Sequence, residues 1–191
     1  MVGNLPNFTK LEILKCFLRF RRKISRNELS RELGIGEGTT RTILNLLKEK
    51  GLLDSSKKGH FLSRKGKDML DVIENEIEGP QKIKATKLFP DFKVNAILLK
   101  KHSEIRNTCK LRDLAVKEKA EGALILSYNG KLYTPESEHN KDFDDFESIF
   151  KLKNGDIIII SFAEREKHAE SGCLAVASGL NEELKSFLNQ F

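Results

Sequence analysis

Residues 25–63 decide the fold of the first part of this chain, and they read SRNELSRELGIGEGTTRTILNLLKEKGLLDSSKKGHFLS. Ser25 followed three residues later by Glu28 is the pattern of a capping box, which closes the amino end of a helix. The glycines of residues 34–38 predict a tight turn after that helix, because glycine tolerates a positive φ. Ile35 is the expected buried anchor of this turn.

A second helix is expected to begin near Glu37 and to end at Gly51. One face of it should be buried, because four side chains recur at helical spacing: Thr40, Ile43, Leu44 and Leu47. Residues 52–53 and 60–63 then predict two short strands joined by the polar loop 54–59. Two helices around a turn followed by a hairpin predict a winged helix-turn-helix, in which the hairpin is the wing.

Winged helices that bind DNA place the second of these helices in the major groove. Arginine can pair bidentately with guanine and asparagine with adenine, and each such pair contributes about 1–3 kcal/mol of discrimination against a wrong base pair. The predicted DNA contacts are the outward side chains of the helix and of the hairpin region: Thr39, Arg41, Thr42, Asn45, Lys48, Lys57, Lys58, His60 and Arg64. A winged helix that binds protein through a solvated helix face is the alternative.

Positive charge is concentrated in the same part of the chain. The whole protein has 34 Lys and Arg against 28 Asp and Glu, but residues 1–67 alone carry 16 basic and 6 acidic side chains. A localised positive field favours binding to phosphates. The basic residues form two clusters: Arg19, Arg21, Arg22, Lys23 and Arg26; and Lys57, Lys58, Arg64, Lys65 and Lys67. We expect phosphate contacts from the second cluster, whereas the first has the pattern of a solvated helix end.

The 191 residues are long enough for two small domains. Glycine and proline in residues 78–81 interrupt the helical pattern, which predicts a winged helix domain over 1–78 and a second domain over 79–191.

An apolar helix capped by Thr9 should begin the first domain, and another helix should follow the wing from Arg64. In the second domain, strands are expected at 92–99, 122–128, 131–133 and from 157, and helices at 106–119, 142–150 and 167–188. Asn129-Gly130 suits a type I′ turn between the second and third strands.

These elements predict an α+β domain, a two-layer αβ sandwich with a four-stranded sheet and helices on one face. The strand order stays open between a ferredoxin-like arrangement and another two-layer sandwich. The whole chain is expected to be a DNA-binding transcriptional regulator. Its second domain would serve for dimerisation or effector sensing.

Several stretches taken together resemble a family of uncharacterised archaeal two-domain proteins: residues 33–44, residues 59–63, Leu111-Arg112-Asp113, Gly122-Ala123 and Tyr133-Thr134-Pro135. The resemblance implies a winged helix followed by a domain of unknown function. The helix-turn segment is also similar to that of the bacterial central glycolytic gene regulator. The second domain is similar in fold to the insert domain of bacterial-type aspartyl-tRNA synthetases, which implies a mainly antiparallel sheet. The family brings no established activity.

Enzyme chemistry is not indicated, because GxSxG, P-loop, HExxH and dinucleotide-binding motifs are absent from the sequence. The four histidines lack helical metal-ligand spacing, so neither a metal nor a cofactor is expected. The three cysteines, Cys16, Cys109 and Cys173, are isolated in sequence and should be reduced, mostly buried thiols. Pairing of Cys173 with His168 as a nucleophile is disfavoured, since the two lie five positions apart and off one face of a helix. The acidic residues between 136 and 147 could hold a divalent cation, although a solvated loop is the better interpretation.

A small-molecule effector site could combine Arg112 and Asp113 with Gly122, where the guanidinium of Arg112 would bind an anion. An exposed ion pair beside a turn is the alternative.

The sequence shows no membrane span and no signal peptide, which predicts a cytoplasmic protein. The expected partners are double-stranded DNA and a second copy of the chain, because two-fold winged-helix dimers match palindromic half-sites. An RNA- or protein-interaction module linked to translation is the first rival function, and a small-molecule enzyme is the second.

Overall fold

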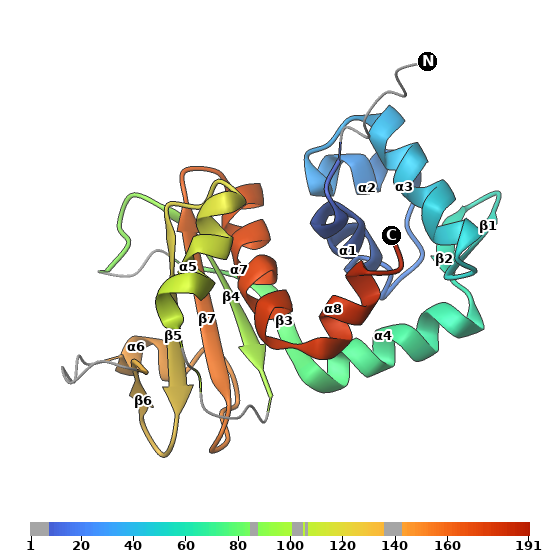
Figure 1. The fold of residues 1–191 in the computed structure, drawn as a ribbon. Coiled ribbons are helices and arrows are strands. Elements are labelled where there is room, and N and C mark those ends of the chain that lie inside the picture. Colours follow the sequence, from blue (N-terminus) through green and yellow to red (C-terminus); the bar gives the residue numbers. More distant parts are fainter. Residues whose placement is uncertain (1–7, 85–87, 101–104, 106, 136–142) are drawn as a thin grey trace. The chain divides into compact units, whose positions relative to one another are not determined.

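The computed structural model describes residues 8–84, 88–100, 105, 107–135 and 143–191. The chain divides into two compact units, one formed by Met1–Ile73 with Ser186–Phe191 and the other by Glu74–Lys185. The first unit is helical with one hairpin, and the second is an antiparallel sheet packed against helices (Figure 1). The predicted α+β fold class is therefore confirmed.

Three helices begin the first unit: α1 (Lys10–Leu18), α2 (Arg26–Leu33) and α3 (Glu37–Glu49). Thr9 closes the amino end of α1 with a complete capping box, in which Glu12 reciprocates. At α2, the Ser25 hydroxyl accepts a hydrogen bond from the backbone N–H of Glu28 at 3.3 Å. The predicted capping box is only half formed there, because the Glu28 carboxylate bonds to Arg22.

The turn between α2 and α3 depends on Gly34, which takes a left-handed conformation with φ of 63°. The backbone N–H groups of Gly34 and Ile35 return to the last turn of α2, and the Ser30 hydroxyl donates to the Ile35 carbonyl at 2.6 Å. Ile35 itself is half-buried, so it is a weaker anchor than the sequence predicted. In α3 the predicted stripe is buried, and this fixes which face of the helix looks outward.

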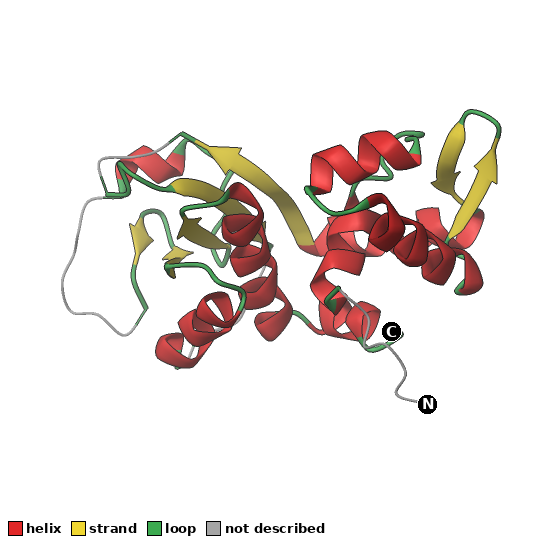
Figure 2. Ribbon diagram, turned by 90° about the horizontal axis from the view of Figure 1, so that it is seen from above, coloured by secondary structure: helices red, strands yellow, loops and turns green. Residues whose placement is uncertain are grey.

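The hairpin consists of β1 (Leu53–Ser56) and β2 (Gly59–Leu62), joined by Lys57 and Lys58. Figure 2 shows these strands projecting from the helices of their domain. The backbones of Ile24 and His60 exchange two hydrogen bonds of 3.1 and 2.9 Å, which tie β2 to the segment before α2. A Cβ on Gly59 would lie 2.7 Å from the Ile24 carbonyl oxygen, so this close approach requires glycine. The hairpin is therefore fixed at its base while its tip extends outward.

The carboxyl end of the chain differs from the prediction. The helix expected over 167–188 is two helices, α7 (Glu166–Leu180) and α8 (Glu182–Leu188). Asn181 separates them in an extended conformation, and its side-chain oxygen accepts from the backbone N–H of Leu184 at 2.9 Å. The ring of Phe187 packs on Phe17 of α1, with centroids 4.9 Å apart. Residues 186–191 thus belong to the first unit, whereas the predicted range 79–191 placed them in the second domain.

Among its described residues, the second unit contains five strands, where the sequence predicted four. They are β3 (Ile77–Ile83), β4 (Lys93–Leu99), β5 (Gly122–Tyr128), β6 (Leu132–Tyr133) and β7 (Ile157–Ala163). Their order is β3-β4-β7-β5-β6, and all pairs are antiparallel. The additional strand, β3, directly follows α4 (Arg64–Glu76) and contains the Gly79-Pro80 segment that predicted a break. An edge strand tolerates proline because one of its sides makes no ladder hydrogen bonds.

Both faces of this sheet are covered, which corrects the expectation of helices on one face alone. On one face lie α5 (Thr108–Lys117) and α7, where the Cys173 thiol donates to the Asn95 carbonyl at 3.0 Å. On the other face, α6 (Asp144–Glu147) and its flanks supply Phe143, Phe146 and Phe150 to a buried apolar cluster. Burial from both sides explains why residues 157–160 are four consecutive isoleucines.

The β5–β6 hairpin forms at the predicted place with a different turn. Tyr128 pairs with Leu132, which leaves the three-residue loop 129–131, and Gly130 has a φ of 72°. A type I′ turn would need two central residues with positive φ, and Asn129 is not among the residues with positive φ. In the part of the chain that the structure describes, no helix is long and apolar enough to cross a membrane.

Candidate nucleic-acid interface

The outward face of α3 carries the residues that the sequence selected for base contacts. Arg41, Thr42 and Asn45 are exposed, while Thr39 and Lys48 are half-buried. The Thr42 hydroxyl donates to the Gly38 carbonyl at 3.2 Å, so it is engaged within its own helix. Arg41 and Asn45, four residues apart, lie on one face of the helix and have no side-chain partner among the described residues. These two side chains are the strongest candidates for contacts to bases.

The hairpin tip presents two lysines. Lys57 and Lys58 are exposed, and no ion pair holds either ammonium group within the described ranges. The backbone beneath them is fixed, because the Ser56 hydroxyl accepts from the Lys58 N–H at 3.2 Å and donates to the Gly59 carbonyl at 3.4 Å. The tip therefore combines an ordered backbone with free cationic ends.

The first turn of α4 is also basic. Arg64 and Lys67 are exposed and, in the parts of the chain described, have no acidic partner. Lys65 differs from them, because its ammonium group donates to the Lys50 carbonyl at 2.8 Å. We refer below to Arg41, Lys57, Lys58, Arg64 and Lys67 as the outward cations.

His60 lies where the hairpin meets α2 and α3. It is the register partner of Ser55, whose hydroxyl accepts from the Lys48 ammonium group at 3.2 Å. Burial is the main factor that lowers the pKa of His60 below its ordinary value of 6.5, and the nearby charges of Lys48 and Arg26 lower that pKa further. The imidazole is accordingly neutral at pH 7. Ser55 and Arg26 were absent from the predicted contact set. The sequence interpretation placed Ser55 in the loop 54–59, whereas the two-residue turn at 57–58 pairs it with His60.

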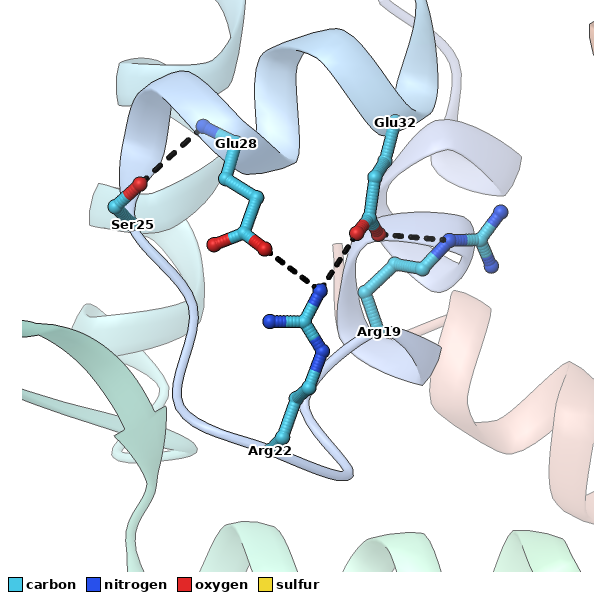
Figure 3. Close-up of polar contacts among 5 residues, drawn as sticks. All are labelled: Arg19, Arg22, Ser25, Glu28 and Glu32. Carbon is cyan, nitrogen blue, oxygen red and sulfur yellow. Dashed lines mark hydrogen bonds and ion pairs between the residues drawn. The ribbon is translucent and has the colours of Figure 1, made fainter.

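The first basic cluster is occupied by contacts within the domain (Figure 3). Nη2 of Arg22 lies 2.8 Å from a carboxylate oxygen of Glu28 and 2.7 Å from one of Glu32, and Nε of Arg19 lies 3.7 Å from the other oxygen of Glu32. The hydrogen bond from Arg22 lowers the pKa of Glu28 below its usual value. Three residues of this cluster, Arg19, Arg22 and Arg26, are called the paired arginines below.

Arg26 and Lys23, which also belong to the first basic cluster, contact side chains of other segments. Arg26 reaches across to Glu37 at the start of α3, with 3.3 Å between Nη2 and the carboxylate oxygen. The Lys23 ammonium group lies 5.1 Å from the centroid of the Phe61 ring, within range of a cation–π contact. Most of this cluster is thus engaged in contacts within the domain.

The candidate effector residues are not brought together. Arg112 and Asp113 are exposed on α5. Gly122 pairs with Phe162 across β5 and β7, and a Cβ on Gly122 would lie 2.8 Å from the Phe162 ring. That ring packs against the apolar cluster on the face opposite α5 and α7. Gly122 is therefore explained by the aromatic ring above it, and it does not share a site with Arg112.

Metal and thiol chemistry finds little support in the described residues. No group of three His, Cys, Asp or Glu side chains converges there. Of the acidic stretch, Glu136, Glu138 and Asp142 lie outside the described residues, as do His102 and His139, while Glu147 accepts from the Leu132 N–H at 3.0 Å. Cys16 and Cys173 are buried and Cys109 is exposed. Burial raises the pKa of the Cys173 thiol, which keeps it protonated and disfavours a nucleophilic role.

Comparisons with known proteins divide this chain at a similar place. Residues 11–68 match the family described as "PH0730-like, N-terminal domain", and residues 91–181 match "Domain of unknown function (DUF4443)". No match is found among curated proteins. A solved structure, "Hypothetical protein PH0730 from Pyrococcus horikoshii OT3", is similar to this chain at 26% sequence identity with a TM-score of 0.78, over 95% of this chain and 100% of that chain. This chain is therefore similar to a PH0730-like N-terminal domain over residues 11–68 and, further along, to DUF4443 over residues 91–181.

Proposed function

We propose that this protein is a transcriptional regulator that binds double-stranded DNA through a winged helix-turn-helix. In this proposal α3 enters the major groove, and the β1–β2 hairpin is the wing that contacts the neighbouring backbone. The observation that carries the proposal is the contrast between cations in one domain. The paired arginines are held by glutamates, whereas the outward cations have no acidic partner in the described chain.

The position of the outward cations supports an anionic partner. Arg64 and Lys67 lie in the first turn of α4, which contains no acidic residue. The amino end of a helix carries a partial positive charge, so cations there are unfavourable unless an external anion compensates them. A phosphate backbone would supply that anion, and it would do so beside the lysines of the hairpin tip.

The chemistry of α3 supports reading of base edges. Arg41 and Asn45 have the donor geometries that guanine and adenine accept in the major groove. Both are exposed and lie on the face opposite the buried stripe of α3. The amino end of α3 has little side-chain bulk, because its N-cap residue Gly36 and Gly38 in its first turn carry no side chain and have open space around them. That shape permits close approach of the helix to a groove.

The second domain would serve for dimerisation or effector sensing. Its sheet is covered on both faces, so it needs no partner to bury its core. Residues 79–191 are nearly neutral, with 18 basic and 17 acidic side chains. Such a surface is poorly suited to a second nucleic-acid contact. A dimer would let two copies of α3 read half-sites about one helical turn apart.

The test is binding of the purified full chain to duplex DNA of random sequence, with duplex and single-stranded RNA of equal length for comparison. We expect binding to duplex DNA that weakens steeply with added salt. Stronger binding to RNA would favour the alternative of an interaction module linked to translation. Absence of binding to any nucleic acid at low salt would refute the proposal.

A further inference from the structure

Four side chains gather where the hairpin meets α2 and α3. Lys48, in the last turn of α3, donates to the Ser55 hydroxyl on β1 at 3.2 Å. Ser55 is the register partner of His60 on β2, so both side chains emerge on one face of the hairpin. Arg26 approaches from the first residue of α2, since its charge and that of Lys48 both act on His60. Hydrogen-bond donors from two helices and two strands thus meet at one junction.

The proposed docking brings DNA backbone to this junction. In this docking α3 lies in the major groove and the hairpin tip lies beside the neighbouring groove. The sugar-phosphate backbone of the DNA that separates these two grooves then runs between α3 and the hairpin. Lys48 has three N–H donors and uses one on Ser55, so others remain for a phosphate oxygen. The charges that act on His60 are those of Arg26 on α2 and Lys48 on α3, both cations, and Arg26 is itself paired with Glu37 of α3. The neighbour of His60 across β1 is the uncharged Ser55.

The protonation state of His60 follows from its surroundings. Its Nδ1 atom is buried and has no hydrogen-bond partner among the described residues. A second proton on the ring would therefore place an N–H in a buried position without an acceptor. The two neighbouring cations oppose the same proton. Nε2 is the nitrogen that can carry the single proton of a neutral ring and donate it to an oxygen.

We infer that Lys48, Ser55 and His60, flanked by Arg26, bind one phosphodiester of the DNA backbone, and that His60 contributes as a neutral hydrogen-bond donor. This inference rests on the proposed function and adds the role of each group. Lys48 acts by charge, which releases a counterion when the phosphate binds. His60 acts by a hydrogen bond, which releases none.

The experiment measures the affinity of the full-length protein for a random-sequence duplex at several salt concentrations. Lys48→Met should reduce the slope of log affinity against log salt by about one. His60→Leu should weaken binding several-fold at every salt concentration and leave that slope unchanged. His60→Gln should restore binding, because its amide is a neutral donor. Lys110→Met, an exposed lysine on α5, is the matched control and should change neither quantity.

The pH dependence of wild-type binding gives a second measurement that needs no variant. Between pH 8.5 and pH 7 the affinity should stay constant, because no proton is taken up by His60. An affinity that rises on acidification in this range would overturn the neutral donor, and so would a failure of His60→Gln to restore binding. If His60→Leu binds as the wild type does, His60 is no ligand. If the wild type binds no duplex at low salt, the proposed function fails and this inference with it.

Discussion

The paired arginines and the outward cations belong to one domain and carry the same charge, yet they differ in what surrounds them. Glu28 and Glu32 lie four residues apart on α2 and converge on Arg22, while Glu37 receives Arg26. The hairpin tip and the first turn of α4 offer no such carboxylates in the described chain. The difference teaches that a count of charges overestimates the surface available to a polyanion. A cation without an ion pair inside the protein can form a new ion pair with phosphate, whereas a cation already paired with a glutamate would have to give up that pair.

The largest effect is expected at the hairpin tip. Lys57→Ala combined with Lys58→Ala should lower the salt slope of DNA binding by about two and the affinity at physiological salt by roughly tenfold or more, since two phosphate contacts are lost. Titrations of a random duplex at a series of salt concentrations measure both quantities. The matched control removes two charges from the paired set, Arg19→Gln with Arg22→Gln, and should change the slope much less. Equal effects of the two double variants would remove the distinction between the two sets of cations.

Arg41 tests base reading as distinct from phosphate binding. Arg41→Ala should cost about 1–3 kcal/mol at the base positions that Arg41 contacts, because a bidentate pair with guanine is lost. Selection of binding sites from a random library by the wild type and the variant shows this as relaxed preference at a subset of positions. Arg112→Ala, an exposed arginine on α5, should leave the selected sequences unchanged. Identical preferences for Arg41→Ala and the wild type would assign Arg41 to solvent.

The stability of the folded protein should depend on pH through His60. Its pKa in the folded protein is below the ordinary value of 6.5, so the unfolded chain binds the proton more readily. The free energy of unfolding should therefore fall as the pH drops below about 6.5 and approaches the folded-state pKa, and this contribution should be absent in His60→Gln. Denaturant unfolding of both proteins at several pH values measures it. A pH profile that is the same in the variant would show that other groups dominate this range.

The smallest effect is expected at the paired arginines. Glu28→Gln removes one partner of Arg22, and exposed ion pairs contribute little to stability, so the thermal midpoint should decrease only slightly at pH 7. Because Arg22 lowers the pKa of Glu28, this contribution is present above about pH 4.5 and is lost as the pH falls through the folded value. Glu121→Gln, at an exposed position, is the control. A large change in the salt dependence of DNA binding by Glu28→Gln would mean that Arg22, once released from Glu28, contacts a DNA phosphate.

The sequence was most informative where a pattern is local. Helical periodicity predicted the buried face of α3, and the polar loop 54–59 predicted the hairpin, because both depend on neighbouring residues. The strand β3 was missed, since proline and glycine indicate a break unless the strand is known to lie at an edge. The break at Asn181 depends on its side chain capping α8, and an asparagine within an otherwise helical pattern is a weak signal.

In the candidate site too, the sequence predicted local features and missed those that depend on distant residues. Exposure of Arg41 and Asn45 followed from the period of α3, whereas the position of His60 between Lys48 and Arg26 required three segments to meet. The pairing of Arg22 could have been predicted in part, because Glu28 and Glu32 share one face of their helix. Gly122 was misleading, because the residue that explains it, Phe162, is 40 positions away in sequence.

The measurement that tests the central claim most directly is selection by the full-length protein from fragmented genomic DNA and total RNA, with sequencing after washes of rising salt. We predict that the DNA retained at the highest salt shares one motif, and that the Arg41→Ala variant selects the same fragments with a blurred motif. Retention of RNA in preference to DNA, or of DNA without any shared motif, would contradict a regulator that reads bases through α3.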